Sequence, residues 1–476
     1  MKNYKELGFK AGLEIHQQLE GKKLFCNCPT EIRKDKPDFT ITRRLRASAG
    51  ESGNVDQAAA YELEKSKEFE YRGYYESLCE IETDSAPPLP VNKDALKVAL
   101  QMCKLLNMKL VDKIQFMRKT VIDGSNVSGF QRTALIGYAG YIEIKDKKIR
   151  VDSLCLEEEA AQVVKRTKEK DIYNLSRLGI PLLEIATAPD FSNPEECKEG
   201  AAKIGMLLRS VQGMKRGIGS IRQDVNVSIK GGARTEIKGF QEIKSIPIVI
   251  DNEIERQQKL IKENKPVESA VRKAEPNGST KYLRPMPGAD RMYPETDIPT
   301  ITPDKFEFEE VETIEQKTER YKQQYDLNDD LANIAVKHEN KNNYDFEELF
   351  KKHISKNLHA KTIIDLILIK PKEVEKKINK KINIEQHKDK ILGEISKAKI
   401  TATAIPEILM MIAEKGKLEL NRFYQISEEE IEKIIIKIIK ENQGAPRGAI
   451  MGKIMATLKG KADGKLVNQI LSKHLK

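Results

Sequence analysis

Residues 221–240 read IRQDVNVSIKGGARTEIKGF and contain two β-type runs. Apolar and polar residues alternate from Gln223 to Ile229 and again from Thr235 to Phe240, which is the period of a strand with one buried face. The pair Gly231-Gly232 between the two runs is a turn signal. The stretch therefore predicts two neighbouring strands of a sheet.

Helical and β-type stretches alternate on either side of this pair. Gly140 to Lys145 is a further β-type run, whereas Asp94 to Met108 and Pro194 to Val211 have the apolar spacing of helices. The Pro-rich segment Arg284 to Pro303 closes the region. We therefore expect an α+β fold, in which a mixed α/β domain occupies residues 1–300.

Beyond this region Lys, Glu, Ile and Leu dominate, and apolar residues recur every three or four positions. Glu428 to Glu441 is the clearest helix, and the loop 443–448 separates it from a terminal helical pair. We expect a helical domain over residues 301–400 and a helical tail domain over residues 401–476.

The composition describes a folded protein rather than a disordered or membrane-embedded one. Hydrophobic residues make up 39% and charged residues 33% of the 476 positions. The N-terminus lacks an apolar signal region, and charged residues interrupt the isoleucine-rich stretch Ile431 to Ile439. We expect a cytoplasmic protein without a membrane anchor.

All six cysteines precede residue 200 and do not form the framework of a secreted disulfide protein. They are expected to be reduced thiols. Cys26 and Cys28, together with Cys79, could belong to a zinc site, but no second CxxC pair supports that interpretation.

The net charge of +10 is unevenly distributed. Residues 301–350 contain 6 Lys and Arg against 14 Asp and Glu, whereas residues 431–476 contain 10 against 3. The basic C-terminal end is therefore the better candidate for contact with a polyanion. A general lysine bias would also raise the total charge, without any such partner.

Five strand-like segments each contain a carboxylate. Alternation places Glu14 and His16 on one face of the first segment, a spacing suited to a shared metal ion. The others contain Glu157-Glu158-Glu159, Glu184 within an apolar run, Asp224 two residues before Asn226, and Glu236 two residues before Lys238.

Burying such carboxylates without a cation is costly, so a cluster of them implies metal ions or a lattice of Arg and Lys. Oxygen ligands with one imidazole favour Mg²⁺ or Mn²⁺ over zinc. The alternative is that these are unrelated acids on half-solvated strands. The sequence has no GxxxxGK[ST] loop, so any ATP would be held by metals and arginines. It also offers no activated nucleophile for a glutaminase.

Eight ordered motifs resemble the GatB/GatE family, the transamidase subunits of tRNA-dependent amidotransferases. They are GLEIHQQL (12–19), FCNC (25–28), LEEEA (156–160), NLSRLGIPLLEIATAPD (174–190), GSIRQDVNVSI (219–229), ARTEIK (233–238), RPMPGADRMYPETDIP (284–299) and GKADGKLVNQIL (460–471). Gln17-Gln18, Cys26-Asn27-Cys28 and residues 132–137 are similar to GatE, the archaeal branch of the family, which serves Glu-tRNA(Gln).

The resemblance implies an enzyme in which ATP phosphorylates the Glu side chain of Glu-tRNA(Gln), after which ammonia displaces phosphate to give Gln-tRNA(Gln). It implies bound Mg²⁺ at a cluster of Glu14, His16, Glu158, Glu184, Asp224 and Glu236. In the same motifs Arg177, Arg222 and Lys238 are candidates for orienting phosphate or the substrate carboxylate, with salt-bridge scaffolding as the alternative.

The resemblance also implies partners. Ammonia would come from GatD, an asparaginase-like partner protein, in a heterotetramer. The helical tail would bind the tRNA body, with Lys453, Lys459, Lys461 and Lys465 as phosphate contacts, or else these lysines form a solvated helix face.

One departure from the family stands out. The archaeal branch carries an inserted domain between the helix after the Glu-Ile-Lys strand and the Arg-Pro motif, but here a short segment joins Leu260 to Arg284. The catalytic motifs are nevertheless intact. A non-catalytic tRNA-binding protein of the same fold is the alternative function, and it would be expected to have lost Glu14, His16, Glu184 or Asp224.

Overall fold

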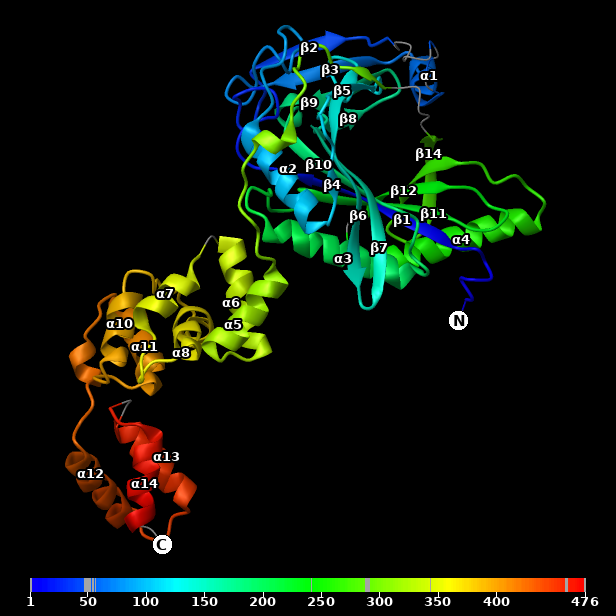
Figure 1. The fold of residues 1–476 in the computed structure, drawn as a ribbon. Coiled ribbons are helices and arrows are strands. Elements are labelled where there is room, and N and C mark those ends of the chain that lie inside the picture. Colours follow the sequence, from blue (N-terminus) through cyan, green and yellow to red (C-terminus); the bar gives the residue numbers. More distant parts are fainter. Residues whose placement is uncertain are drawn as a thin grey trace. The chain divides into compact units, whose positions relative to one another are not determined.

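The computed structural model describes residues 2–46, 53, 55, 57–240, 242–286, 292–342, 344–458 and 461–474. The chain forms two compact units, Met1–Thr313 and Ile314–Lys476 (Figure 1). The first unit is α+β and the second is helical, which confirms the expected fold class. Among the described residues, no helix is both long and apolar enough to cross a membrane.

The division between the units follows Thr313 rather than residue 300. Phe306, Phe308 and Val311 pack against the core of the first unit, so the chain leaves that unit later than the Pro-rich segment indicated. The predicted boundary near residue 400 stays a prediction.

An eleven-stranded sheet forms the body of the first unit. In order across the sheet its strands are β14 (Thr280–Pro285), β13 (Ala270–Ala274), β12 (Thr235–Phe240), β11 (Ile221–Ser228), β1 (Lys10–Gln18), β10 (Pro181–Thr187), β7 (Lys147–Glu158), β6 (Phe130–Ile144), β5 (Met117–Thr120) and β15 (Met292–Pro294), with β4 (Lys109–Leu110) paired to β6.

The strands predicted from Gln223 to Ile229 and from Thr235 to Phe240 are confirmed as β11 and β12, which pair in antiparallel fashion. The run from Gly140 to Lys145 is the end of the longer strand β6. Strand β1 lies between β10 and β11 and is antiparallel to both. The N-terminal strand is therefore placed beside two strands that lie about 170 to 210 residues away in the sequence.

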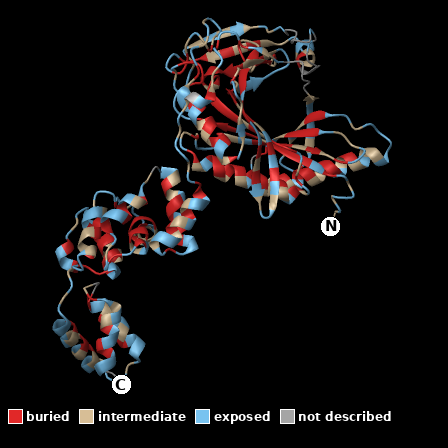
Figure 2. Ribbon diagram, in the orientation of Figure 1, coloured by how far each residue is buried: buried red, intermediate tan, exposed pale blue. Residues whose placement is uncertain are grey.

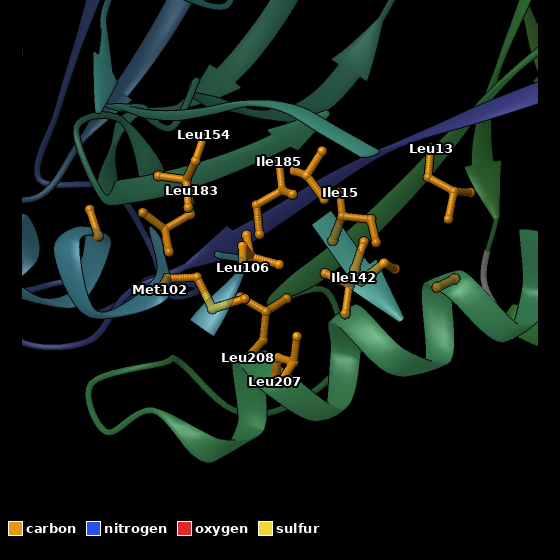
Figure 3. Close-up of a cluster of buried hydrophobic side chains, with 14 of the residues drawn as sticks. Leu13, Ile15, Met102, Leu106, Ile142, Leu154, Leu183, Ile185, Leu207 and Leu208 are labelled. Carbon is orange, nitrogen blue, oxygen red and sulfur yellow. The ribbon is translucent and has the colours of Figure 1, made fainter. Parts of the chain in front are cut away.

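One face of this sheet packs on helices α2 (Lys93–Leu105), α3 (Pro194–Ser210) and α4 (Ile246–Lys262). Asn92 caps α2 and Asn193 caps α3, and both helices confirm the predicted ones. In Figure 3, Ile15 and Ile185 of neighbouring strands meet Leu208 in a continuous apolar layer. Because strand side chains alternate, Glu14, His16 and Glu184 lie on the opposite face.

A second, four-stranded sheet completes the unit. It contains β2 (Phe39–Arg43), β3 (Glu68–Gly73), β9 (Lys170–Asn174) and β8 (Gln162–Arg166), in that order. Tyr71 and Tyr173 are fully buried in its core. The short helix α1 (Gln57–Glu64) contacts the edge strand β14 of the large sheet.

The second unit is built of ten α-helices among its described residues. They are α5 (Ile314–Tyr325), α6 (Asp329–Asn342), α7 (Phe346–His353), α8 (Ala360–Ile364), α9 (Lys370–Ile378), α10 (Lys388–Ser396), α11 (Ile405–Lys415), α12 (Glu428–Glu441), α13 (Arg447–Leu458) and α14 (Gly464–His474).

The last three helices share a hydrophobic core of their own. On α12 the buried residues Ile431, Ile435 and Ile438 recur at helical spacing, and the other faces of the helix are more exposed (Figure 2). Helix α12 has the bounds predicted from the sequence.

Candidate functional site

A polar pocket opens on the face of the large sheet opposite its helices. Its volume is about 480 Å³. Strands β1, β5, β7, β10, β11 and β12 each contribute charged side chains, and the main ones are Glu14, His16, Lys119, Glu157, Glu184, Arg222, Asp224, Glu236 and Lys238. The five strand-like segments with predicted carboxylates thus converge on one pocket.

Strand register explains this convergence. On the sheet Glu14 lies directly opposite Asp224, and His16 lies directly opposite Glu184. The imidazole Nε2 of His16 is 3.5 Å from Glu14 Oε1 and 3.4 Å from Glu184 Oε2. The position of His16 between Glu14 of the same strand and Glu184 of the paired strand is therefore fixed by the register of β1 and β10.

Two groups of side chains in the pocket have the spacing of metal ligands. Glu14, His16 and Asp224 offer ligand atoms within 4.8 Å of one another, and so do His16, Glu157 and Glu184. His16 belongs to both groups. Carboxylate oxygens with one imidazole suit a hard divalent cation, so the residues present could hold Mg²⁺.

Lysines compensate part of the carboxylate charge. Lys238 Nζ lies 2.7 Å from Asp224 Oδ2 and 2.6 Å from Glu236 Oε1. At the other side of His16, Lys119 Nζ lies 3.0 Å from Glu157 Oε2 and 3.6 Å from Glu184 Oε2. Each lysine thus bridges two carboxylates of the pocket.

The pKa values of the carboxyl groups diverge. Burial, and then the charge of Glu184, raise the pKa of Glu14 to about 6. Burial also acts to raise the pKa of Glu184, but Lys119 and His16 outweigh it and hold that pKa well below its usual range. Paired acids with separated pKa values are typical of functional sites.

Burial acts in the opposite direction on the pKa values of the basic groups, but neighbouring carboxylates outweigh it. Burial acts to lower the pKa of His16, but the hydrogen bond to Glu184 and the nearby carboxylates outweigh it and raise that pKa. Likewise Asp224, Glu236 and Glu14 overcome burial and raise the pKa of Lys238.

Glu158 is a correction to the predicted cluster. Its carboxylate points to the reverse face of the sheet, where Oε1 accepts from Arg132 Nη1 at 3.1 Å. The neighbours Glu157 and Glu159 line the pocket instead. Sequence reasoning chose the wrong member of the triplet, because three adjacent glutamates give no indication of which one shares the face of Glu184.

The predicted arginines separate into two environments. Arg222 lines the pocket, and its Nη2 lies 2.9 Å from both carboxylate oxygens of Glu159. Arg177 donates to the backbone carbonyls of Ala160 and Ala161, each at 2.8 Å, and is not among the described residues that line the pocket. Its hydrogen-bond partners are backbone carbonyls rather than the carboxylates of a salt bridge, and a role in orienting substrate stays a prediction.

Lys119 is a pocket residue that sequence reasoning missed. It follows Arg118 in the short strand β5, and nothing in its local pattern distinguishes it from other lysines. Its burial beside two carboxylates is visible only once β5 is paired with β6.

A separate candidate metal centre lies outside this pocket. Ligand atoms of Cys26, Cys28, Cys79 and Glu82 lie within 4.8 Å of one another. Glu82 Oε1 accepts from Cys26 Sγ at 2.9 Å and lies 3.6 Å from the buried Lys23 Nζ. Three thiols and one carboxylate form a ligand set that suits zinc better than Mg²⁺. Glu82 is the fourth member that the cysteine spacing did not indicate.

The predicted tRNA-contacting lysines lie in the last two helices and the turn before α14. Lys453 and Lys465 are exposed and Lys461 is half-buried. Lys453 Nζ donates to Asn442 Oδ1. Lys459 lies outside the described residues.

Comparisons with known proteins agree over the whole chain. The family described as the GatB/GatE catalytic domain matches residues 9–309, and a GatB domain matches residues 344–475. A protein of Methanocaldococcus jannaschii named as the E subunit of glutamyl-tRNA(Gln) amidotransferase is 36% identical, with 100% of this chain and 99% of the relative covered. Proteins of the same name from Methanococcus maripaludis strain S2 and Thermococcus sibiricus are 36% and 33% identical. The Methanococcus maripaludis alignment covers 100% of this chain and 99% of the relative. The Thermococcus sibiricus alignment covers 99% of this chain and 98% of the relative.

These relatives are longer than this chain. The alignment with the Methanocaldococcus jannaschii protein extends over 632 positions, whereas this chain has 476 residues. In the structure, α4 is followed directly by the hairpin of β13 and β14, which turns at Gly278 with a φ of +84°. The segment between Leu260 and Arg284, which the structure describes throughout, thus consists of the end of α4, a short connection and this hairpin, and it contains no inserted domain.

Proposed function

The chain belongs to the GatB/GatE family, and from this premise we propose that it is the subunit of a tRNA-dependent amidotransferase that converts Glu-tRNA(Gln) into Gln-tRNA(Gln). The observation that carries the proposal is the pocket in which Glu14, His16, Glu184 and Asp224 converge. The alternative of a non-catalytic relative is disfavoured, since all four residues are present and face one another.

The reaction has two steps. An oxygen of the tRNA-linked Glu side chain attacks the γ-phosphoryl group of ATP, which forms an acyl phosphate and releases ADP. Ammonia then attacks the acyl carbon, phosphate leaves, and the nitrogen gives up a proton to produce the amide. Phosphorylation is needed because a carboxylate oxygen is a poor leaving group.

Mg²⁺ bound by the two ligand groups around His16 would neutralise the negative charge that develops on the phosphoryl group during transfer. The chain's own contribution is to hold those ligands in place. His16 is fixed between Glu14 and Glu184 by strand pairing, so little reorganisation is needed when charge develops.

Arg222 and Lys238 are the proposed cationic groups at the pocket wall. Arg222 is half-exposed, with 45% of its side chain accessible, and can reach an anionic substrate from the rim. Lys238 is held deeper by Asp224 and Glu236. Arg222 is therefore the better candidate for orienting a phosphate group or the substrate carboxylate.

Ammonia is proposed to come from GatD, the asparaginase-like partner protein, in a heterotetramer. Among the described residues that line its pocket are acids, lysines, two arginines, one histidine and the hydroxyl residues Thr120 and Ser125, but no cysteine. Ser125 Oγ donates to Asp123 and Asn126 rather than to a histidine, so the lining offers no activated nucleophile of the kind that a glutaminase uses. We further propose that the helical tail, whose net charge is positive over residues 431–476, binds the tRNA body.

The proposal is tested by supplying the purified chain with Glu-tRNA(Gln), ATP, MgCl₂ and ammonium chloride. Gln-tRNA(Gln) should form without the partner, because phosphorylation and amination share the pocket of this chain. Ammonia release from glutamine should be absent. Binding of tRNA without any Gln-tRNA(Gln) at saturating ammonium would instead favour the non-catalytic alternative.

A further inference from the structure

Behind the pocket, on the reverse face of the large sheet, four charged side chains form a continuous network. Arg118 donates to Glu295 through Nε at 2.8 Å and through Nη2 at 2.7 Å. Its Nη2 also donates to Asp297 Oδ2 at 3.1 Å. Arg132 donates to Glu295 through Nε at 2.7 Å and to Glu158 through Nη1 at 3.1 Å. We call Arg118, Arg132, Glu158 and Glu295 the arginine lattice.

Glu295 is the central member of the arginine lattice. Its side chain has no exposed surface, and it accepts from both guanidinium groups as well as from the backbone N–H of Asp297 at 3.0 Å. The ring of Phe130 lies beneath both arginines, with centroid distances of 4.6 Å to Arg118 and 5.1 Å to Arg132. The carboxylate is therefore fully satisfied and held in one position.

This arrangement has a consequence for strand pairing. Arg118 of β5 lies directly opposite Arg132 of β6, and like charges in that position destabilise a strand pair. Glu295 bridges the two and removes the repulsion. It also ties down β15, an edge strand of three residues whose partner is β5, since its backbone N–H donates to Phe116 O at 3.0 Å.

Residues adjacent to the lattice members, in the sequence or across the strands, point into the pocket. Lys119 follows Arg118, Gln131 precedes Arg132, and Met292 is paired with Lys119 across the strands. All three line the pocket, because successive side chains of a strand face opposite sides of the sheet. The position of Lys119 against Glu157 and Glu184 thus depends on the same short strands that Glu295 holds.

We propose that Glu295 is a positioning residue for the pocket. By clamping Arg118 and Arg132 it fixes β5 and β15, and it thereby holds Lys119 beside Glu157 and Glu184. The kinetic part of this inference rests on the proposed function, whereas the clamp itself is a property of the fold.

The test compares Glu295→Gln with Glu253→Gln. Glu253 is the matched control, because its side chain is equally inaccessible and bridges Arg256 and Arg272 in the same unit, yet these partners lie on α4 and β13 rather than on β5 and β6. Hydrogen exchange should accelerate at residues 116–120 and 292–295 in Glu295→Gln and stay unchanged there in Glu253→Gln.

The kinetic arm uses a double-mutant cycle with Lys119→Met. Glu295→Gln should lower kcat by about 10-fold or more, the order expected when a pocket group is displaced, without changing KM for tRNA. In the Lys119→Met background the same substitution should have little further effect on kcat. A purely structural role predicts a lower melting temperature with kcat per folded molecule unchanged.

Arg118→Gln provides a second variant if Glu295→Gln folds poorly. Arg118 is 23% exposed, and its removal leaves Glu295 paired with Arg132. It should show the same exchange pattern with a smaller amplitude. Unchanged exchange in β5 and β15, or a full effect of Glu295→Gln in the Lys119→Met background, would overturn the proposal. If the wild-type chain shows no transamidation, the proposed function fails while the exchange measurement still decides the clamp.

Discussion

At the scale of single residues, Glu14 should link the stability of the protein to the proposed cation binding. Its pKa is raised from 4.5 to about 6 by burial and by Glu184. Between these values the native state binds more protons than the unfolded chain, so the carboxyl group destabilises the cation-free protein as the pH rises through that window. A cation bound by the deprotonated group reverses the penalty.

We therefore predict that Mg²⁺ raises the melting temperature more at about pH 7.5 than at about pH 5. The variant Glu14→Gln should be more stable than the wild type at the higher pH without Mg²⁺ and should respond less to added Mg²⁺. Thermal denaturation at both pH values provides the measurement. An equal response of the wild type to Mg²⁺ at the two pH values would contradict this view of Glu14.

The glutamate triplet shows where residue-scale prediction from sequence ends. Alternation within one strand correctly placed Glu14 and His16 on a common face, because that pattern is local. Choosing among Glu157, Glu158 and Glu159 requires the register between β7 and β10, which pairs Glu158 with Pro181 and Glu157 with Leu182. Register depends on contacts between distant segments, so the triplet alone could not identify the pocket residues.

At the scale of elements, close contact between α2 and β6 explains a glycine in the middle of a strand. A Cβ added at Gly140 would lie 2.4 Å from the carbonyl oxygen of Leu106, at the end of α2. That same carbonyl accepts from Tyr141 N at 2.8 Å, so the helix end cannot move away without losing a hydrogen bond.

Gly140→Ala should therefore destabilise the first unit by about 1–3 kcal/mol, as expected for overpacking. Gly393→Ala is the control, since no atom lies within 4 Å of the added Cβ in helix α10. It should stabilise the second unit by about 0.5–1 kcal/mol, because alanine is the better helix former. Denaturant unfolding of each variant checks both signs, and a neutral Gly140→Ala would argue against the close contact.

The elements themselves were largely predictable, whereas their arrangement was not. Helices α3 and α12 and strand β12 follow from local periodicity and capping residues, and their observed bounds lie within one residue of the prediction. The insertion of β1 between β10 and β11 leaves no local signal in the sequence. The pocket is a product of that insertion, so the residue types at the site could be predicted more readily than their distances.

At the scale of the whole molecule, the proposed function assigns catalysis to the acidic pocket and tRNA binding to the basic tail. Changing Lys453, Lys461 and Lys465 together to Gln should weaken tRNA binding and reduce its salt dependence by up to about one unit of slope per lysine. Exchanging the exposed Lys93, Lys97 and Lys109 of the first unit provides a control of equal charge. Titrations over a range of KCl concentrations measure the slope, and an identical loss in both triple variants would indicate a general charge effect.

The most direct measurement of the central claim is turnover by Glu184→Gln. The substitution keeps the size of the side chain but removes an anionic group that lies 3.4 Å from His16 Nε2 and 3.6 Å from Lys119 Nζ. If Glu184 holds a cation where phosphoryl charge develops, the rate of ADP formation should fall by about 100-fold or more, with tRNA affinity nearly unchanged. If the carboxylate only stabilises the fold, the melting temperature will fall while folded molecules keep near-normal turnover, and that result would contradict the account.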